Sequence, residues 1–343
     1  FVWFAGVSPV EVWVLLFKGA FGDWYSWQNT LQRAAPLMLT ALCVAIPARA
    51  GLVIIGGEGA LVLGGLACAG LAQGLPLPAN IAGTVLVCAA GAVAGALWIM
   101  VAGWLRQFRG INETISSLLL AYVAIGLFKH LVEGPLRDPS SLNKPSTFAL
   151  AEGLRIGGIA GSDVHWGLVL GVVACIVSSL WLRWTPSGFS VRVVGGNLRT
   201  AQLVGLPASR LVLLACALGG AAAGLAGAVE VAAVHTSANA ALIAGYGYAG
   251  ILVSFIARHK PLAVIPVAIL FGGFGAAGSL LQRRLGLPDA SVLLLQGIAF
   301  VLILASEALR DLDWKALWSR IARSAASREG PSPAQVAMGD KIA

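Results

Sequence analysis

The sequence predicts an all-α polytopic membrane protein with about nine to ten transmembrane helices, some of them broken, and a short helix on the cytoplasmic side. Hydrophobic residues make up 58% of the 343 residues and charged residues only 11%, against about 25% in an ordinary soluble domain. A soluble chain of this length could not bury so much apolar surface. The formal charge of +8 comes from basic residues in short loops between apolar runs, a pattern typical of membrane topology and not of a nucleic-acid-binding face.

Apolar runs bounded by turn or charge signals indicate where the spans lie. A helix crosses the bilayer core with about 20 apolar residues. Nine runs reach or approach that length: 34–50, 51–73, 79–104, 111–132, 164–184, 208–233, 239–257, 261–282 and 289–309. Residues 1–17 are interrupted by Pro9 and Glu11, so we expect the end of a preceding helix followed by a segment in the membrane interface. That earlier helix would bring the total to ten.

Lys and Arg in the short loops predict the orientation, because such loops stay on the cytoplasmic side. Four arginines and no acid lie between residues 183 and 210, and alternating the spans places most other basic clusters on the same side. The longer loop 133–163, whose charges balance, then falls on the extracytoplasmic side. We expect a transmembrane domain over residues 1–309, with a cytoplasmic loop 185–209. A cytoplasmic tail over 310–343 follows, in which apolar residues at helical spacing favour an interfacial helix.

The apolar run from residue 51 to residue 75 carries a single acid, Glu58, in a Gly-Gly-Glu-Gly sequence. A carboxylate at membrane depth is costly, so Glu58 should face protein or water and not lipid. The neighbouring glycines, Gly57 among them, allow the backbone to leave helical geometry or a second helix to approach closely. A broken span beside a buried acid is typical of transporter pathways. We therefore expect Glu58 and Gly57 to lie along a substrate pathway.

A second group of polar residues at membrane depth comprises Glu230, His235, Tyr246 and Tyr248. Neither Glu58 nor Glu230 has an obvious local cation in the sequence. The tyrosines lie in a G-Y-G-Y-A-G run, where they either stack on a ring-shaped solute or pack between helices. A lone histidine such as His235 is more often satisfied locally than functional. We interpret the group as pathway lining and keep the structural role as the alternative.

Loop 185–209 is predicted to contain a short helix from Asn197 to Gly205. Asn197 is a favourable N-cap, LRTAQLV supplies the helical turns, and Gly205 followed by Pro207 ends them. A basic helix in a cytoplasmic loop has no hydrophobic core of its own to join. We interpret it as a docking element for a cytoplasmic partner, with an ordered loop that fixes the topology as the alternative.

Two further patterns concern packing and chemistry. Gly91 with Gly95, and Gly220 with Gly224, have G-x-x-x-G spacing and predict close helix crossings. The chain contains no G-x-x-x-x-G-K-[ST] phosphate loop, no G-x-S-x-G elbow and no His or Cys cluster with metal-ligand spacing. The five cysteines lie in apolar segments and should be buried. We expect no catalytic residue, metal or cofactor in this chain.

Several motifs, in fixed order, resemble one known family. AGLVIIGGEGALVLGGLAC resembles the glycine–glutamate signature of bacterial ABC-transporter permeases of the simple-sugar and nucleoside group, and GINETISSLLLAYVAI, GPLRDPSSLNKPS and VRVVGGNLRTAQLVGLPASR follow it. The likeness covers residues 30–310. The outer-loop and GINE motifs are closer to purine-nucleoside permeases than to ribose or branched-chain amino-acid permeases. The chain departs from the family pattern at Ile54 and Ala60, where Asn and Gln are usual, so its substrate can differ.

The resemblance implies a half-transporter of the bacterial inner membrane that imports nucleosides or simple sugars by alternating access. It implies a second permease, identical or homologous, a cytoplasmic ABC ATPase that binds ATP and Mg, and an extracytoplasmic solute-binding protein. The short loop helix would then be the coupling helix to the ATPase, through Asn197, Arg199, Gln202 and Gly205. Membrane lipids are expected partners and nucleic acid is not.

Three alternatives remain open. A branched-chain amino-acid permease would favour a clamp for a zwitterion, which the sequence does not clearly show. A gradient-driven secondary transporter or channel would show inverted internal repeats, and none is evident. A membrane-embedded enzyme would need a constellation of catalytic side chains on facing helices, which four scattered histidines do not supply.

Overall fold

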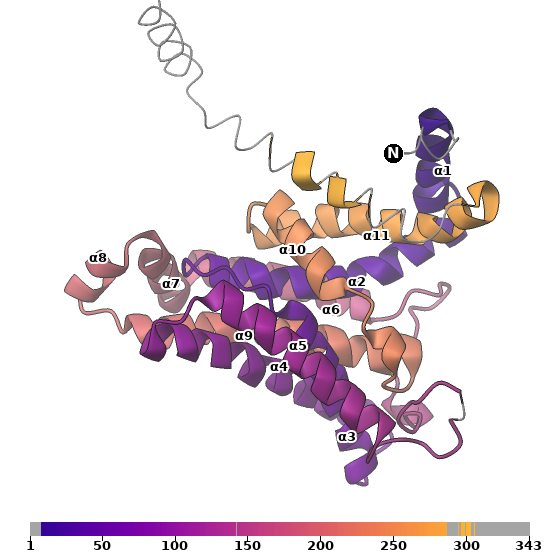
Figure 1. Cartoon of the computed structure of the whole chain (residues 1–343), viewed down its shortest axis with the longest axis horizontal. Coiled ribbons are helices and arrows are strands. Elements are labelled where there is room, and N and C mark those ends of the chain that lie inside the picture. Colours follow the sequence, from indigo (N-terminus) through magenta and orange to yellow (C-terminus); the bar gives the residue numbers. More distant parts are fainter. Residues whose placement is uncertain are drawn as a thin grey trace, which may run out of the picture. The chain divides into compact units, whose positions relative to one another are not determined.

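The structure, a computed structural model, describes residues 8–286 except residue 142, together with residues 294, 296–298, 300–302 and 305. The described residues form α-, 3-10 and π-helical segments and two isolated β-bridges, but no strand. The predicted all-α class is therefore confirmed (Figure 1). The chain divides into two compact units, Phe1–Leu293 and Leu294–Ala343. The elements described below belong to the first unit.

The helices of this unit follow one another along the chain with few long connections. They are α1 (Pro9–Phe21), α2 (Trp24–Ala48), α3 (Gly57–Gly74), α4 (Ile81–Arg109), α5 (Glu113–Glu133), η1 (Glu152–Leu154), α6 (Gly167–Trp184), α7 (Pro186–Gly196), α8 (Leu198–Leu203), α9 (Ala208–Val229), η2 (Glu230–His235), η3 (Ala240–Leu242), α10 (Tyr246–Ile256) and α11 (Pro261–Leu285).

Six helices in the described part of the chain are long and apolar enough to cross a membrane: α2, α4, α5, α6, α9 with its extension η2, and α11. The chain is thus a multi-pass membrane protein, but a total of nine or ten spans is not confirmed. The expected span 289–309 and the tail 310–343 lie largely outside the described residues. Helix α1, with 13 residues, is too short to span, as the break at Pro9 predicts.

Two of the expected spans contain helices that are shorter than predicted. The run 51–73 begins with non-helical backbone, and α3 starts only at Gly57. The run 239–257 contains a 3-10 turn and the 11-residue helix α10. Both runs are largely apolar, but glycine-rich backbone departs from the helix within them. The prediction of broken helices is therefore correct for these two segments, and neither is among the helices long and apolar enough to be confirmed as a span.

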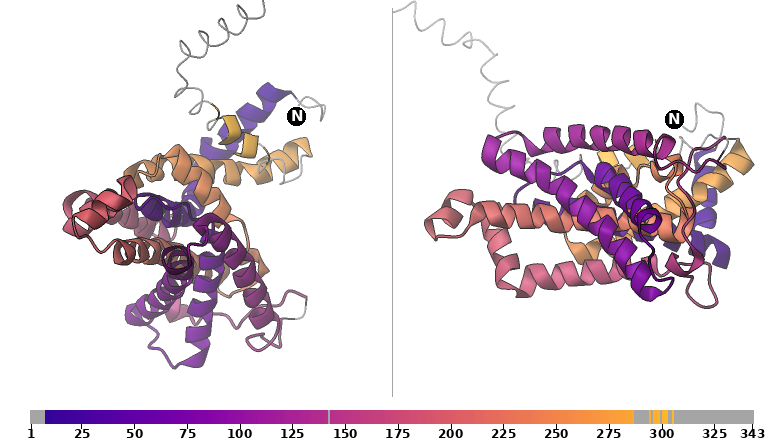
Figure 2. Two further views of the ribbon diagram at one scale, coloured as in Figure 1. Left: turned by 60° about the vertical axis from the view of Figure 1, so that its left-hand side comes forward. Right: turned by 90° about the horizontal axis from the view of Figure 1, so that it is seen from below.

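Helix α2 forms the centre of the unit. Every residue from Ala34 to Pro47 is buried, and α2 packs against α6, α9, α10 and α11 (Figures 1 and 2). A helix that is buried and apolar on all sides is typical of the middle of a bundle. The outer helices α4, α5 and α6 instead expose many large apolar side chains, which suits contact with lipid. Helices α7 and α8 lie at one end of the unit, and the loop between α5 and α6 lies at the other (Figure 2).

Glycines bring α4 and α9 into direct backbone contact. A Cβ atom on Gly224 would meet the carbonyl oxygen of Gly91, and one on Gly95 would meet that of Gly220. The two predicted G-x-x-x-G motifs therefore face each other across this crossing. Gly64 of α3 also lies against Gly224, so three helices meet where no side chain fits.

Replacing Gly224 by alanine should destabilise the fold by about 1–3 kcal/mol, because the added methyl group must push α4 away from α9. Thermal unfolding can be followed by labelling of the five free cysteines, all of which are buried in the native fold, as predicted. Gly126→Ala is the matched control, since a Cβ atom there meets nothing within 4 Å. Equal melting temperatures of the two variants would contradict the assigned crossing.

Candidate functional site

The Glu58 side chain is fully buried where two helices begin. Helix α3 starts at Gly57, and α10 starts after Gly245, whose φ of 79° lies in the left-handed region. One carboxylate oxygen of Glu58 accepts a hydrogen bond from the Gly245 amide at 2.8 Å, and the other accepts one from the Gly247 amide at 2.6 Å. Amides at a helix start have no partner within the helix. Glu58 therefore caps α10 from a different helix, and its charge lies at the positive end of the α10 dipole.

Close approach of backbone to backbone makes this cap possible. A Cβ atom on Gly247 would collide with the amide nitrogen of Glu58, so only glycine fits there. Gly57 lies against the same residue, since its Cβ position is 3.7 Å from the Gly247 Cα atom. Of the predicted pathway residues, Glu58 and Gly57 thus form a structural junction between α3 and α10. Their predicted contact with solute stays a prediction.

Glu230 and His235 lie in the same π-helical turn, η2, at the end of α9. Nε2 of His235 is 3.6 Å from a carboxylate oxygen of Glu230, and the two side chains are 23% and 4% exposed. A π turn places residues five apart on one face, and such turns occur frequently at functional sites. Helical spacing does not reveal this i, i+5 contact, and His235 acts as a cation for Glu230 only when its imidazole is protonated.

Arg33 of α2 joins this cluster, although the sequence pattern does not point to it. Its guanidinium is close enough to the Tyr246 hydroxyl and to Glu230 to interact with both electrostatically. Arg33 comes immediately before the apolar run of α2. A cation at the end of such a run is ordinarily interpreted as an anchor at the membrane interface, so the sequence does not single it out. Arg33 is exposed on this chain and Tyr246 is half-buried, so the cluster reaches the surface of the subunit. Tyr248 lies apart from the cluster, near Tyr122 of α5.

A polar pocket of about 710 Å³ opens beside His235. Its lining comes from the predicted outer loop and from the segment after η2: Asn143, Lys144, Pro145, Ser146, His235, Ser237, Asn239, Ala240 and Ala241. The Thr147 amide donates to the Ala238 carbonyl oxygen at 3.0 Å, and the Ala238 amide donates to the Thr147 hydroxyl at 2.9 Å. The outer loop is thereby fixed against the segment that joins His235 to α10.

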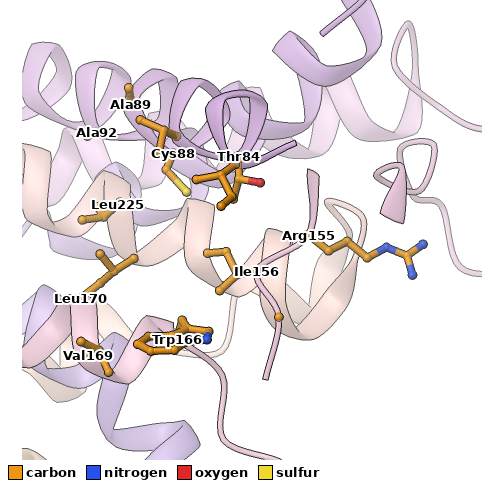
Figure 3. Close-up of a pocket in the computed structure, with 13 residues that line it drawn as sticks. Thr84, Cys88, Ala89, Ala92, Arg155, Ile156, Trp166, Val169, Leu170 and Leu225 are labelled. Carbon is orange, nitrogen blue, oxygen red and sulfur yellow. The ribbon is translucent and has the colours of Figure 1, made fainter. Parts of the chain in front are cut away.

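A second pocket, of about 700 Å³, has a different character (Figure 3). It lies between α4, α6 and residues 155–157, and apolar side chains such as Ile156, Leu170 and Leu225 line it. Arg155 belongs to the lining, but its guanidinium points away from the cavity (Figure 3). None of the predicted pathway residues contributes to this pocket. Its lining suits acyl chains and not a polar solute.

Loop 185–209 contains two helices, α7 and α8, where the sequence predicts one. Asn197 caps α8 as predicted, since its side-chain oxygen accepts from the Thr200 amide at 3.1 Å, and Gly205 has a φ of 79°. The helix itself spans six residues. Arg199 and Gln202 are exposed, and Leu203 beside them is 87% exposed. A nearly bare leucine indicates an apolar contact that the sequence analysis, which favoured polar groups, does not include.

No group of three or more His, Cys, Asp or Glu side chains that could hold a metal ion occurs in the part of the chain that the structure describes.

Known proteins similar to this chain are transport permeases. The family described as "Branched-chain amino acid transport system / permease component" matches residues 26–304. The chain is 32% identical to a glucose ABC transporter permease protein of Haloferax volcanii over 88% of this chain and 82% of that one. It is 26% identical to a guanosine ABC transporter permease protein of Bacillus subtilis, over 89% and 88% of the two chains. It is 25% identical to a nucleoside ABC transporter permease protein of Lactococcus lactis, over 78% and 76%.

This match covers most of the chain, and the helical fold agrees with it. The chain therefore belongs to this permease family, as the resemblance in the sequence predicts.

Replacing Glu58 by alanine should lower the stability of the fold, because two buried amides lose their acceptors at a cost of about 1–3 kcal/mol each. Glu58→Gln should cost less, since its remaining carbonyl oxygen still accepts one hydrogen bond. Thermal unfolding in detergent measures both effects, with the exposed Glu133→Ala as the control. If the alanine variant has the same melting temperature as the wild-type protein, the cap does not stabilise α10.

Proposed function

We propose that the chain is the membrane-spanning permease subunit of an ATP-driven ABC importer for nucleosides or simple sugars, in the bacterial inner membrane. The names of its relatives support this class, since they are ABC transporter permeases for glucose, guanosine and nucleosides. The observation that favours the solute class is the group of hydrogen-bonding side chains formed by Arg33, Glu230, His235 and Tyr246, of which His235 also lines the polar pocket.

An uncharged solute fits the cluster better than a charged one. Glu230 is paired with His235, and Arg33 interacts with both Tyr246 and Glu230. Hydroxyl and ring nitrogen groups can exchange hydrogen bonds with such side chains, and Tyr246 offers an aromatic face for a ring.

An amino acid would need a site for its carboxylate. In transporters with broken helices, the positive end of a half-helix commonly supplies that site. Here Glu58 already occupies the start of α10, so that end is neutralised within the protein. This argues against the branched-chain amino-acid alternative despite the wording of the family description.

The proposed partners follow from the two ends of the unit. The ATPase, which binds ATP and Mg, would hold α8 through Arg199, Gln202 and the exposed Leu203. The solute-binding protein would dock on the outer loop and deliver solute to the pocket at His235. A second permease would cover the exposed side of Arg33, so that the cluster lines a pathway between two subunits. ATP-driven closure would move α8 and alternate the access of this pathway.

The solute class can be tested by measuring ATPase activity of the complete transporter in nanodiscs with its solute-binding protein. Nucleosides or sugars should stimulate the activity, and branched-chain amino acids should not, because the cluster lacks a free carboxylate site. Stimulation by an amino acid alone would overturn the solute class. Transport by the lone chain down a gradient would favour the secondary-transporter alternative.

Replacing Glu230 by glutamine should raise the solute concentration for half-maximal stimulation about tenfold or more, because a hydrogen bond to a charged group is worth about 1.5–3 kcal/mol. The melting temperature should change little, since the amide fills the same space. Glu133→Gln, which makes the same change at an exposed position of the outer end, is the control. An unchanged solute dependence in the Glu230 variant would remove this residue from the pathway.

Substituting Arg199 and Gln202 together by alanine should uncouple ATP hydrolysis from transport without unfolding the bundle, because both side chains are exposed on α8. Leu203→Asp should go further and release the ATPase during purification, since it places a charge in an apolar contact. Leu75→Asp, at the opposite end of the unit, should retain the ATPase. Full coupled transport by the double variant would contradict the assignment of α8 as coupling helix.

A further inference from the structure

A basic pocket of about 460 Å³ lies beside α7, whose Arg192 belongs to its lining. Four cations from different elements line it: Arg49 at the end of α2, Arg183 in the last turn of α6, Arg192 of α7 and Lys260 at the start of α11. Ser179 is the one uncharged polar side chain in the lining, and the other lining residues are apolar.

Within the part of the chain that the structure describes, no carboxylate lines this pocket. The ion pair Arg106–Glu113 and the contact Glu230–His235 involve none of the four cations. The sequence has no Asp or Glu in residues 164–229 or in 231–288, so α6, α7, α10 and α11 contribute no carboxylate. Like charges that share a half-enclosed space are unfavourable unless an anion lies between them.

The cations are held close together by the fold. Nε of Arg49 donates to the His259 carbonyl oxygen at 3.0 Å, which fixes its guanidinium beside the start of α11. Burial and the nearby charge of Arg192 lower the pKa of Arg49. The amino end of α11, a helix of 25 residues that begins at Pro261, adds its positive dipole end to the same region.

The surface around the pocket is apolar and faces outward. Leu262 in the lining is 51% exposed, and on α6 Leu180 is 43% and Trp184 is 76% exposed. Tryptophan is typical of the boundary between lipid tails and headgroups. A free anion would gain nothing from this surface, whereas the acyl chains of a lipid would cover it.

We propose that this pocket binds the phosphate headgroup of an anionic phospholipid from the cytoplasmic leaflet, with its acyl chains along α6 and α11. Basic pockets between transmembrane helices on this side of a membrane bind acidic headgroups in this way. The phosphate of the bound lipid places a negative charge among the four cations and reduces their mutual repulsion. It also joins α7, which leads directly into the coupling helix α8, to the ends of α2, α6 and α11.

The test compares two double variants of the complete transporter that lose the same charge. Arg183→Gln with Arg192→Gln removes two pocket cations, and Arg109→Gln with Arg210→Gln removes two exposed cations that do not line the pocket. Native mass spectrometry with dioleoyl phosphatidylglycerol then measures retained lipid. Retention should weaken about tenfold or more in the pocket variant and stay at the wild-type level in the control.

A second measurement distinguishes a bound lipid from a soluble anion or an acidic protein surface. ATPase activity in nanodiscs should rise when phosphatidylglycerol replaces part of the phosphatidylcholine, for wild type and control but not for the pocket variant. Equal lipid retention by both variants would overturn the proposal. Displacement of the lipid by millimolar inorganic phosphate would assign the pocket to a soluble anion instead. Loss of the ATPase subunit with unchanged lipid retention would assign it to an acidic protein surface.

A pocket variant that has lost only the lipid site must be distinguished from one that does not fold. Cysteine labelling during thermal unfolding reports whether the pocket variant is folded. If it is not, Lys260→Gln alone provides the same test, because Lys260 lies at the start of α11 and its exposed side chain supports no packing. Wild-type lipid retention in a folded Lys260 variant, together with an unfolded double variant, would count against the site.

Discussion

The fold depends on hydrogen bonds to the backbone amides and carbonyls of helix ends and non-helical segments. Inside a membrane no water is present to bond to these groups, so the protein itself must supply their partners. Residues 51–56 run without helical structure before α3, and side chains of α5 bind them. The Thr114 hydroxyl donates to the Val53 carbonyl oxygen at 3.0 Å, and the Ile55 amide donates to the Ser117 hydroxyl at 3.1 Å. Glu58 then satisfies the amides at the start of α10. One carboxylate and two hydroxyls thus permit two short helices where uninterrupted spans would otherwise be needed.

The junction at Glu58 also positions the polar cluster. Tyr246 is the first residue of α10, so the cap that fixes this helix end fixes the tyrosine as well. The Thr40 hydroxyl of α2 donates to the Tyr246 carbonyl oxygen at 3.0 Å, and Arg33 of the same helix interacts with its phenol group. The Glu58 cap therefore stabilises the start of α10 and also holds Tyr246 in its position in the polar cluster. The family membership supports the role of a transport permease, and the proposal of an uncharged solute depends on the hydrogen-bonding groups of this cluster.

Hydrophobic pattern predicted the helical class, the six long spans, the glycine crossing of α4 with α9 and the cap at Asn197, because each depends on local spacing. It could not predict the short lengths of α3 and α10, since apolar content does not report backbone conformation. The pairing of Glu230 with His235 depends on a π turn, and Arg33 joins them only through the tertiary packing of α2. The exposure of Leu203 likewise depends on the absence, among the elements that the structure describes, of any neighbour that packs over it, and sequence periodicity does not report tertiary packing.

The hydrogen bonds between Thr147 and Ala238 make the outer loop and the segment leading to α10 a single mechanical linkage. Ala238 lies between η2 and the start of α10, so a displacement of the loop acts at once on His235 and on the amides that Glu58 holds. Glu58 in turn belongs to α3, whose glycines lock against α9, the helix that begins next to α8. Direct contacts therefore connect loop 133–163 with the opposite end of the unit through α10, α3 and α9, and the Glu58 carboxylate is the contact that joins α10 to α3.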